Sequence, residues 1–139
     1  MNWLFSALIA AIVIVAGAAL WVRLAPSDPA RWHVAPTADQ DRDKPGGVVR
    51  ILPGNAEGLA RLDQIIRATP RTRRLAGSLD DGMITYVTRS ALWGFPDYTT
   101  IALRDDEIVV HARLRFGQSD MGVNNARVSR WLDQLGRKG

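Results

Sequence analysis

The feature that most constrains this chain is an uncharged run of 20 residues close to its start, from Trp3 to Val22. Ser6 is its only polar side chain. A helix rises about 1.5 Å per residue, so such a run spans about 30 Å, the thickness of the hydrocarbon core of a bilayer. Trp3 and Trp21 stand at the two ends, where indole rings favour the membrane interface. We therefore predict a transmembrane anchor over residues 1–23.

A cleaved signal peptide is the alternative, because Ala16-Gly17-Ala18 offers an A-x-A cleavage site. A retained anchor fits better, since the apolar run exceeds the roughly 7 to 15 residues of a signal peptide and no Lys or Arg precedes it. Gly17 lies among alanines and gives the helix a patch of small residues on which another helix could pack. Gly17 is therefore a candidate partner contact, although glycine and alanine are common in such helices.

Residues 24–47 are expected to form a linker rich in proline and aspartate. Four prolines interrupt any helix there, and Gly46-Gly47 ends the stretch. We predict a partly extended tether on the membrane surface. Trp32 is the exception in this polar segment. It could contact lipid headgroups or a partner, but packing against the surface of the domain that follows is the simplest expectation.

Residues 48–139 are expected to fold as one small soluble domain, because 92 residues suffice for one core and not for two. Side chains alternate with a period of two from Met83 onwards, over 98–104 and over 107–116, and Asp105-Asp106 makes a tight turn between the last two strands. Apolar residues recur with helical spacing after Asn55, the expected N-cap of one helix, and after Asn124, the expected N-cap of another. A short strand is expected over 48–52. Two amphipathic helices on one face of an antiparallel sheet predict a two-layer α+β domain.

The composition excludes several classes of site. The chain has no cysteine, which rules out disulfides, thiolate metal sites and cysteine nucleophiles. It has only two histidines, which argues against a histidine-rich metal centre, and we expect no cofactor. Eighteen basic residues stand against 14 acidic ones, without a basic stripe interleaved with aromatic platforms. Nucleic-acid binding is therefore not expected.

One stretch is too particular for an ordinary loop: residues 113–124 read RLRFGQSDMGVN. Together with the TYVTRS of residues 85–90 and the GFPD of residues 94–97, it resembles the domain of unknown function 1499 family of bacteria and chloroplast-bearing organisms. The resemblance covers roughly residues 45–136. The family's activity is unassigned, and its members often bear export or membrane signals.

The resemblance bears on localisation. Arg23 and Arg31 follow the apolar run, so the positive-inside rule alone places the domain in the cytoplasm. The export signals of the family favour the periplasmic side instead. We expect a single-pass protein of a bacterial inner membrane whose domain lies in the periplasm, with the side of the membrane left open by the small charge bias.

Arginines on the expected strands form the main candidate site. Arg113 and Arg115 share one strand face, about 6.6 Å apart, and Arg89 could reach the same face from a neighbouring strand. One hypothesis is a structural network in which these arginines pair with loop aspartates, because buried polar groups must be satisfied. The other is a site for a small anion or an anionic lipid headgroup, aided by loop amides and a helix N-terminus. The complete candidate set is Arg89, Arg113, Arg115, Asp97, Ser119, Asp120 and Asn124.

Two further features of the sequence are candidate contacts. A basic cluster at Arg71, Arg73 and Arg74 is expected to be a solvated helix exit, with a phosphate or headgroup site as the alternative. Trp93 and Phe95, in a Gly/Pro turn, are candidate contacts for a partner or the bilayer, or else the edge of the core.

No catalytic motif is evident. His111 as base, with Ser119 and Asp120, would make a hydrolase only if the three side chains converged, which we do not expect. The sequence favours a membrane-anchored, non-enzymatic accessory or interaction module that associates with a larger membrane protein complex. The alternative is a binding module for a small anion or an anionic lipid headgroup on an arginine-rich sheet face.

Overall fold

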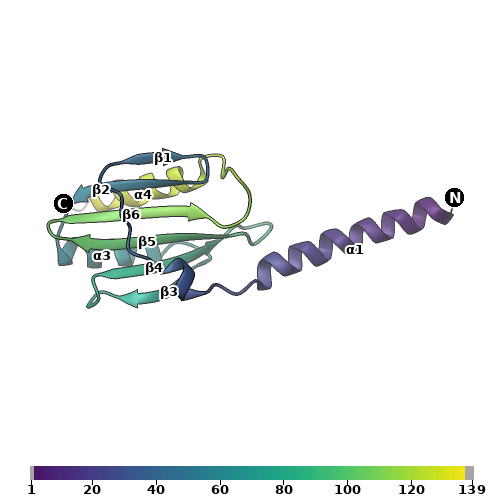
Figure 1. Cartoon of the computed structure of the whole chain (residues 1–139), viewed down its shortest axis with the longest axis horizontal. Coiled ribbons are helices and arrows are strands. Elements are labelled where there is room, and N and C mark those ends of the chain that lie inside the picture. The colour runs from purple at the N-terminus through teal and green to yellow at the C-terminus, as the bar shows by residue number, and fades with distance from the viewer. Residues whose placement is uncertain (1, 137–139) are drawn as a thin grey trace.

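A computed structural model describes residues 2–136 and shows a long apolar helix followed by a compact α+β unit (Figure 1). Helix α1, Asn2–Leu24, has no buried residue and projects away from the rest of the chain. It is long and apolar enough to cross a membrane, and a signal sequence would satisfy the same criteria of length and composition. The predicted α+β class is confirmed.

The sheet has six antiparallel strands in the order β1-β2-β6-β5-β4-β3. The expected hairpin of the last two strands is confirmed, with Asp105 at a φ of 53° in the turn between them. The strand bounds are β1 Arg42–Lys44, β2 Gly47–Pro53, β3 Thr72–Ser78, β4 Met83–Arg89, β5 Pro96–Arg104 and β6 Glu107–Leu114.

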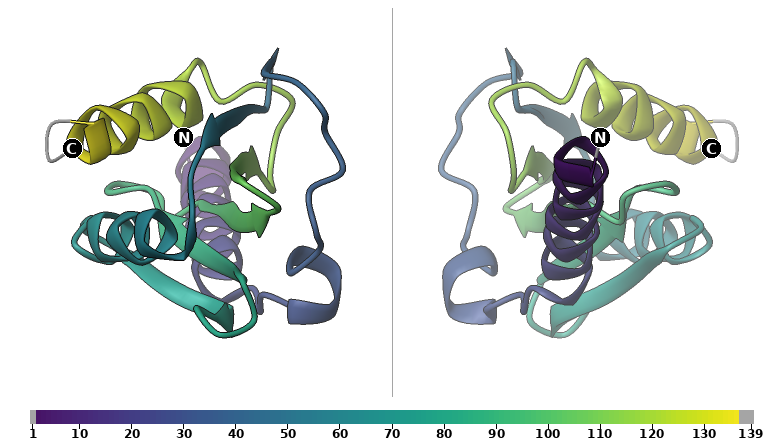
Figure 2. Two further views of the ribbon diagram at one scale, coloured as in Figure 1. Left: turned by 90° about the vertical axis from the view of Figure 1, so that its left-hand side faces the viewer. Right: turned by 90° about the vertical axis from the view of Figure 1, so that its right-hand side faces the viewer.

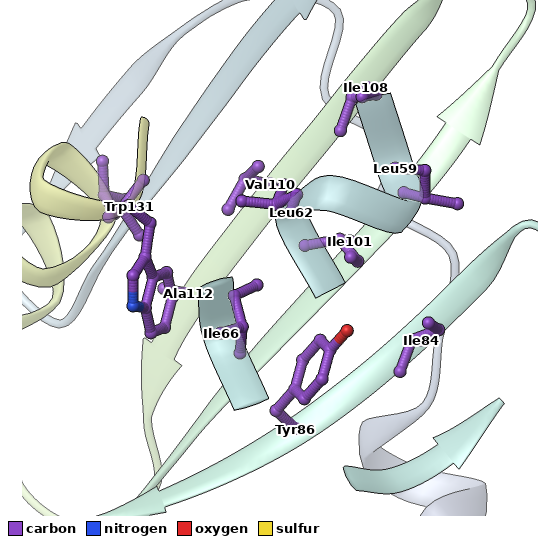
Figure 3. Close-up of a cluster of buried hydrophobic side chains, with 12 residues drawn as sticks. Leu59, Leu62, Ile66, Ile84, Tyr86, Ile101, Ile108, Val110, Ala112 and Trp131 are labelled. Atoms are coloured by element: carbon purple, nitrogen blue, oxygen red, sulfur yellow. The ribbon is translucent and has the colours of Figure 1, made fainter. Parts of the chain in front are cut away.

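Helices α3, Ala56–Arg67, and α4, Val123–Gly136, cover one face of the sheet (Figure 2). The Oδ1 of Asn55 accepts a hydrogen bond of 2.9 Å from the amide of Gly58, which confirms the expected cap of α3. The core lies between these two layers (Figure 3). Its buried side chains include Leu59, Leu62, Ile66, Ile84, Tyr86, Ile101, Ile108, Val110, Val128 and Trp131.

A buried carboxylate ties α3 to the sheet. Asp63 is 1% exposed and accepts hydrogen bonds from the hydroxyl of Tyr86 at 2.6 Å, from Arg74 at 3.0 Å and from Arg67 at 3.1 Å. Burial alone would raise the pKa of Asp63, but the bond from Tyr86 and the two arginines outweigh it and hold that pKa below its usual value. Arg74, expected at a solvated helix exit, is thus part of a structural network.

The two edge strands were not expected from the sequence. β3 lies where a solvated helix exit was predicted, and its register shifts between Arg74 and Ala76, which breaks the alternation that would reveal a strand. Gly77 follows this bulge with a φ of 87°, and a Cβ there would lie 2.1 Å from the carbonyl oxygen of Met83. β1 has only three residues, all exposed, and lies inside the predicted linker.

The second face of the sheet is covered by residues 25–38, which include the short helix α2, Pro29–Trp32 (Figure 2). The ring of Trp32 stacks on Tyr98 of β5, with centroids 4.0 Å apart and planes 12° apart. Nδ1 of His33 lies 2.9 Å from the hydroxyl of Thr85, and Arg104 donates to the carbonyl of Ala38 at 2.9 Å. We call residues 25–38 the strap. The expectation that Trp32 packs on the domain itself is confirmed, whereas the tether predicted along the membrane surface lies on the sheet instead. The division of the chain at residues 24 and 47 remains a prediction.

The stack of Trp32 on Tyr98 is expected to stabilise the fold. Trp32→Ala should lower the free energy of unfolding by about 2 to 4 kcal/mol, because it removes a large aromatic contact that closes one sheet face. The measurement is denaturant unfolding of the full-length protein in neutral detergent, followed by circular dichroism. Val34→Ala is the matched control, since Val34 is 54% exposed and should change stability by less than about 0.5 kcal/mol. Equal stability of Trp32→Ala and the control would contradict a structural strap.

Candidate functional site

Arg113 of β6 fastens the strap to the sheet. Its Nη2 donates to the carbonyl of Trp32, and its Nη1 donates to the hydroxyl of Thr100 at 2.9 Å and the carbonyl of His111 at 3.0 Å. Its guanidinium lies 5.7 Å from the centre of the Trp32 ring, within the range of a cation–π contact. Burial lowers the pKa of Arg113 to about 10, so the side chain remains charged at neutral pH.

Arg115 and Arg89 bind carbonyls of the chain that leads from the end of α1 into α2. Arg115 donates to the carbonyl of Pro26 at 2.7 Å and to the hydroxyl of Tyr98 at 3.1 Å. Arg89 of β4 donates to the carbonyl of Val22 at 3.2 Å, at the end of α1, and to Gly94 at 3.0 Å. The three predicted arginines therefore do serve one side of the sheet. Arg113 and Arg115 bind backbone carbonyls of the strap, whereas Arg89 binds a carbonyl at the end of α1.

The predicted aspartate partners lie elsewhere. Asp97 alternates along β5 with Tyr98, so it points to the helix face and pairs with Arg127 of α4 at 3.4 Å. Burial raises the pKa of Asp97, and Arg127 offsets only part of that rise. The hypothesis that Asp97 and Asp120 pair with Arg113 and Arg115 is therefore wrong, and Arg127 is the residue that sequence reasoning missed.

Asp120 organises the loop that leads into α4. Its carboxylate accepts bonds from the amide of Gly122 at 2.8 Å, from the amide of Asn124 at 3.3 Å and from the side chain of Asn124 at 2.8 Å. Ser119 accepts from the amide of Met121 at 3.2 Å. The prediction that Asn124 caps α4 is wrong, because Asn124 lies inside the first turn, fully buried, where its Oδ1 accepts from Arg127 at 3.0 Å.

The hydrolase arrangement does not form. Ser119 and Asp120 bond to local amides in the loop, whereas His111 lies on the strap face of β6 beside a small hollow of about 220 Å³. Within residues 2–136 no hydrogen bond joins His111 to either side chain. The same described residues contain no group of three His, Asp or Glu side chains arranged to hold a metal ion.

The loop between β4 and β5 lies at the end of the domain nearest α1 (Figure 1). Trp93 and Phe95, in the loop between β4 and β5, are 46% and 42% exposed and face α1 across a hollow of about 370 Å³. No atom outside α1 lies within 4 Å of the place where a Cβ of Gly17 would be. Trp32 is occupied by Tyr98, so it is a contact within the chain.

Most of the chain matches one known protein family. The profile of the DUF1499 family, described as a protein of unknown function, matches residues 22–135. The chain belongs to the DUF1499 family. The match begins near the end of α1 and includes the strap, so the DUF1499 domain as matched extends further towards the N-terminus than the resemblance over residues 45–136 implied.

This DUF1499 chain has no match among curated proteins and a low similarity to solved structures. Among solved structures, the vertebrate conserved region of human METTL16 is similar with a TM-score of 0.42 and 11% sequence identity, over 66% of this chain and 95% of that one.

The lowered pKa of His111 makes the stability of the fold depend on pH. Burial, and then the charges of Arg113 and Lys44, lower the pKa of His111 from 6.5 to about 4. The unfolded chain therefore binds more protons than the DUF1499 fold between these values. The stabilising contribution of neutral His111 is complete above about pH 6.5 and is lost as the pH falls towards about 4.

We expect the free energy of unfolding to decrease on acidification from about pH 7 to 5, and to decrease less steeply in His111→Gln, whose amide does not titrate. Denaturant unfolding of both full-length proteins across this range provides the measurement. Parallel pH profiles for the two proteins would show that His111 carries no such shift.

Proposed function

We propose that this chain is a non-enzymatic accessory module, anchored in a membrane by α1, which joins a larger membrane protein complex. The proposed contact is the surface where α1 meets the loop between β4 and β5. The occupant that fits it is a transmembrane helix of the partner protein.

The observation that carries the proposal is an apolar hollow formed by the helix and the loop together. Its lining is almost entirely apolar, and it runs along the part of α1 that is suited to a bilayer. Large apolar side chains that remain exposed in a folded domain commonly mark an interaction surface. The residues that line the hollow are Ile14, Val15, Ala18, Ala19, Val22, Trp93 and Phe95.

Hydrogen bonds hold the loop between β4 and β5 in place, which favours a defined contact surface over a mobile apolar loop. Arg23 donates to the carbonyl of Leu92, and Arg89 donates to Gly94 at 3.0 Å. Gly94 has a φ of 71°, and a Cβ there would meet the side chain of Arg23 at 2.7 Å. The aromatic pair is thus presented at a fixed position beside α1, and a preorganised surface loses less entropy on binding.

Anion binding on the arginine-rich sheet face is the second candidate function. Arg113 and Arg115 are engaged with the strap, which weighs against that face as a whole. Arg89 also lines an open pocket at the edge formed by β3 and β4, and this observation favours the second candidate.

The test is affinity purification of the tagged full-length protein from its native membranes in mild detergent, with size analysis. Trp93→Ala should reduce the recovery of a stoichiometric partner by about tenfold or more, because truncating a central aromatic anchor is among the costliest interface changes. Leu79→Ala is the control, since Leu79 is 40% exposed in the turn at the opposite end of the sheet.

A photo-crosslinking residue in place of Trp93 should capture that partner through a transmembrane segment, and the same residue at position 79 should not. Recovery of the protein only as a free monomer would contradict the proposal. Crosslinks to lipid alone would show that this surface contacts the bilayer and not a partner helix.

A further inference from the structure

Four arginines converge on one pocket at the end of the sheet nearest α1. The pocket has a volume of about 530 Å³ and is open to solvent on one side. Arg23 comes from the end of α1 and Arg89 from the end of β4. Arg71 lies immediately before β3, and Arg73 is its second residue. Thr72, Val87, Ser90 and Ala91 complete the lining.

The residues that the structure describes do not neutralise the positive charge of this pocket. Its lining contains no Asp or Glu, and none of the salt bridges within residues 2–136 involves any of the four arginines. Burial lowers the pKa of Arg89, and the neighbouring positive charges of Arg73 and Arg115 lower it further. Like charges gathered without a counter-charge make a site that favours an anion.

The arginines are positioned by bonds that leave other donors available. Arg71 donates through Nε to the carbonyl of Arg89 at 3.0 Å, while Arg89 uses Nη1 for both of its carbonyl contacts. Arg73 makes no side-chain hydrogen bond to the described residues. Nitrogen atoms of several guanidinium groups therefore remain free to bind the oxygens of one ligand, and this geometry suits phosphate.

The position of the pocket suggests where the phosphate would come from. Arg23 is the first charged residue after the uncharged run of α1, so with α1 across a bilayer the pocket lies at the level of the lipid headgroups. The loop of Trp93 and Phe95 lies at the same end of the domain, which is the end that would face the membrane.

We propose that the pocket formed by Arg23, Arg71, Arg73 and Arg89 binds the phosphate of an anionic phospholipid headgroup. The site rests on the second candidate function, relocates it from the sheet face to the edge formed by β3 and β4, and is independent of a protein partner at Trp93. A bound lipid would lock the domain against the membrane at the point where α1 leaves it.

The experiment is native mass spectrometry of the full-length protein in neutral detergent, titrated with phosphatidylglycerol, with phosphatidylcholine and with inorganic phosphate. Phosphatidylglycerol should bind with a clear preference, and the preference should weaken as salt is added. Arg73→Gln should weaken phosphatidylglycerol binding by about five- to tenfold, because a charged donor to the phosphate is lost. Arg73→Lys should retain part of the affinity.

Arg130→Gln is the matched control, since Arg130 is also exposed, on α4, and the substitution removes the same charge. Arg73 bonds to no other described side chain, so the unfolding midpoint without lipid should be unchanged in Arg73→Gln. Equal weakening by both variants, or none in Arg73→Gln, would overturn the site. Inorganic phosphate binding as tightly as the lipid, or phosphatidylcholine binding equally, would overturn the assignment to an anionic lipid. Partner recovery should be unaffected by Arg73→Gln, which separates this result from that of Trp93→Ala.

Discussion

A six-stranded sheet has two faces, and the two long helices of this domain cover only one of them. The other carries Tyr98, the hydroxyls of Thr85 and Thr100, and Arg113, and it is closed by the strap. The stack of Trp32 on Tyr98, held by the bond from Arg113 to the Trp32 carbonyl, is therefore the contact on which the architecture depends. It fixes the segment that follows the apolar helix to the middle of the sheet.

Arginine performs three distinct tasks in this fold, and the surroundings of each side chain decide which. Arg113 binds carbonyls, which offer partial charge and direction without requiring a buried carboxylate. Arg127 pairs with Asp97 under α4, where both groups are largely shielded from water. Arg73 has neither kind of partner among the described residues, and it contributes to the net positive charge at the edge formed by β3 and β4. A count of arginines in the sequence does not separate these tasks.

The parts of the fold that sequence analysis anticipated are those with a regular period. The apolar helix, the hairpin of β5 and β6 and the cap at Asn55 follow from local spacing. The strap has no period, because its position results from a contact between Trp32 and a residue far along the chain. The face on which Asp97 finds its partner could be predicted from the sequence, since alternation with Tyr98 along β5 places Asp97 on the helix face. Which arginine meets it there depends on the placement of α4, which no local pattern encodes.

The strap has a consequence for how the domain would meet other molecules. With α1 in a bilayer, the contacts of Arg89 with Val22 and of Arg115 with Pro26 would hold the domain directly against the end of the helix. The domain would then drift laterally at one height and one tilt, and rotate about the membrane normal. Its encounters would be confined to two dimensions, so a binding surface at its membrane-facing end would reach lipids and membrane proteins far more often than soluble molecules.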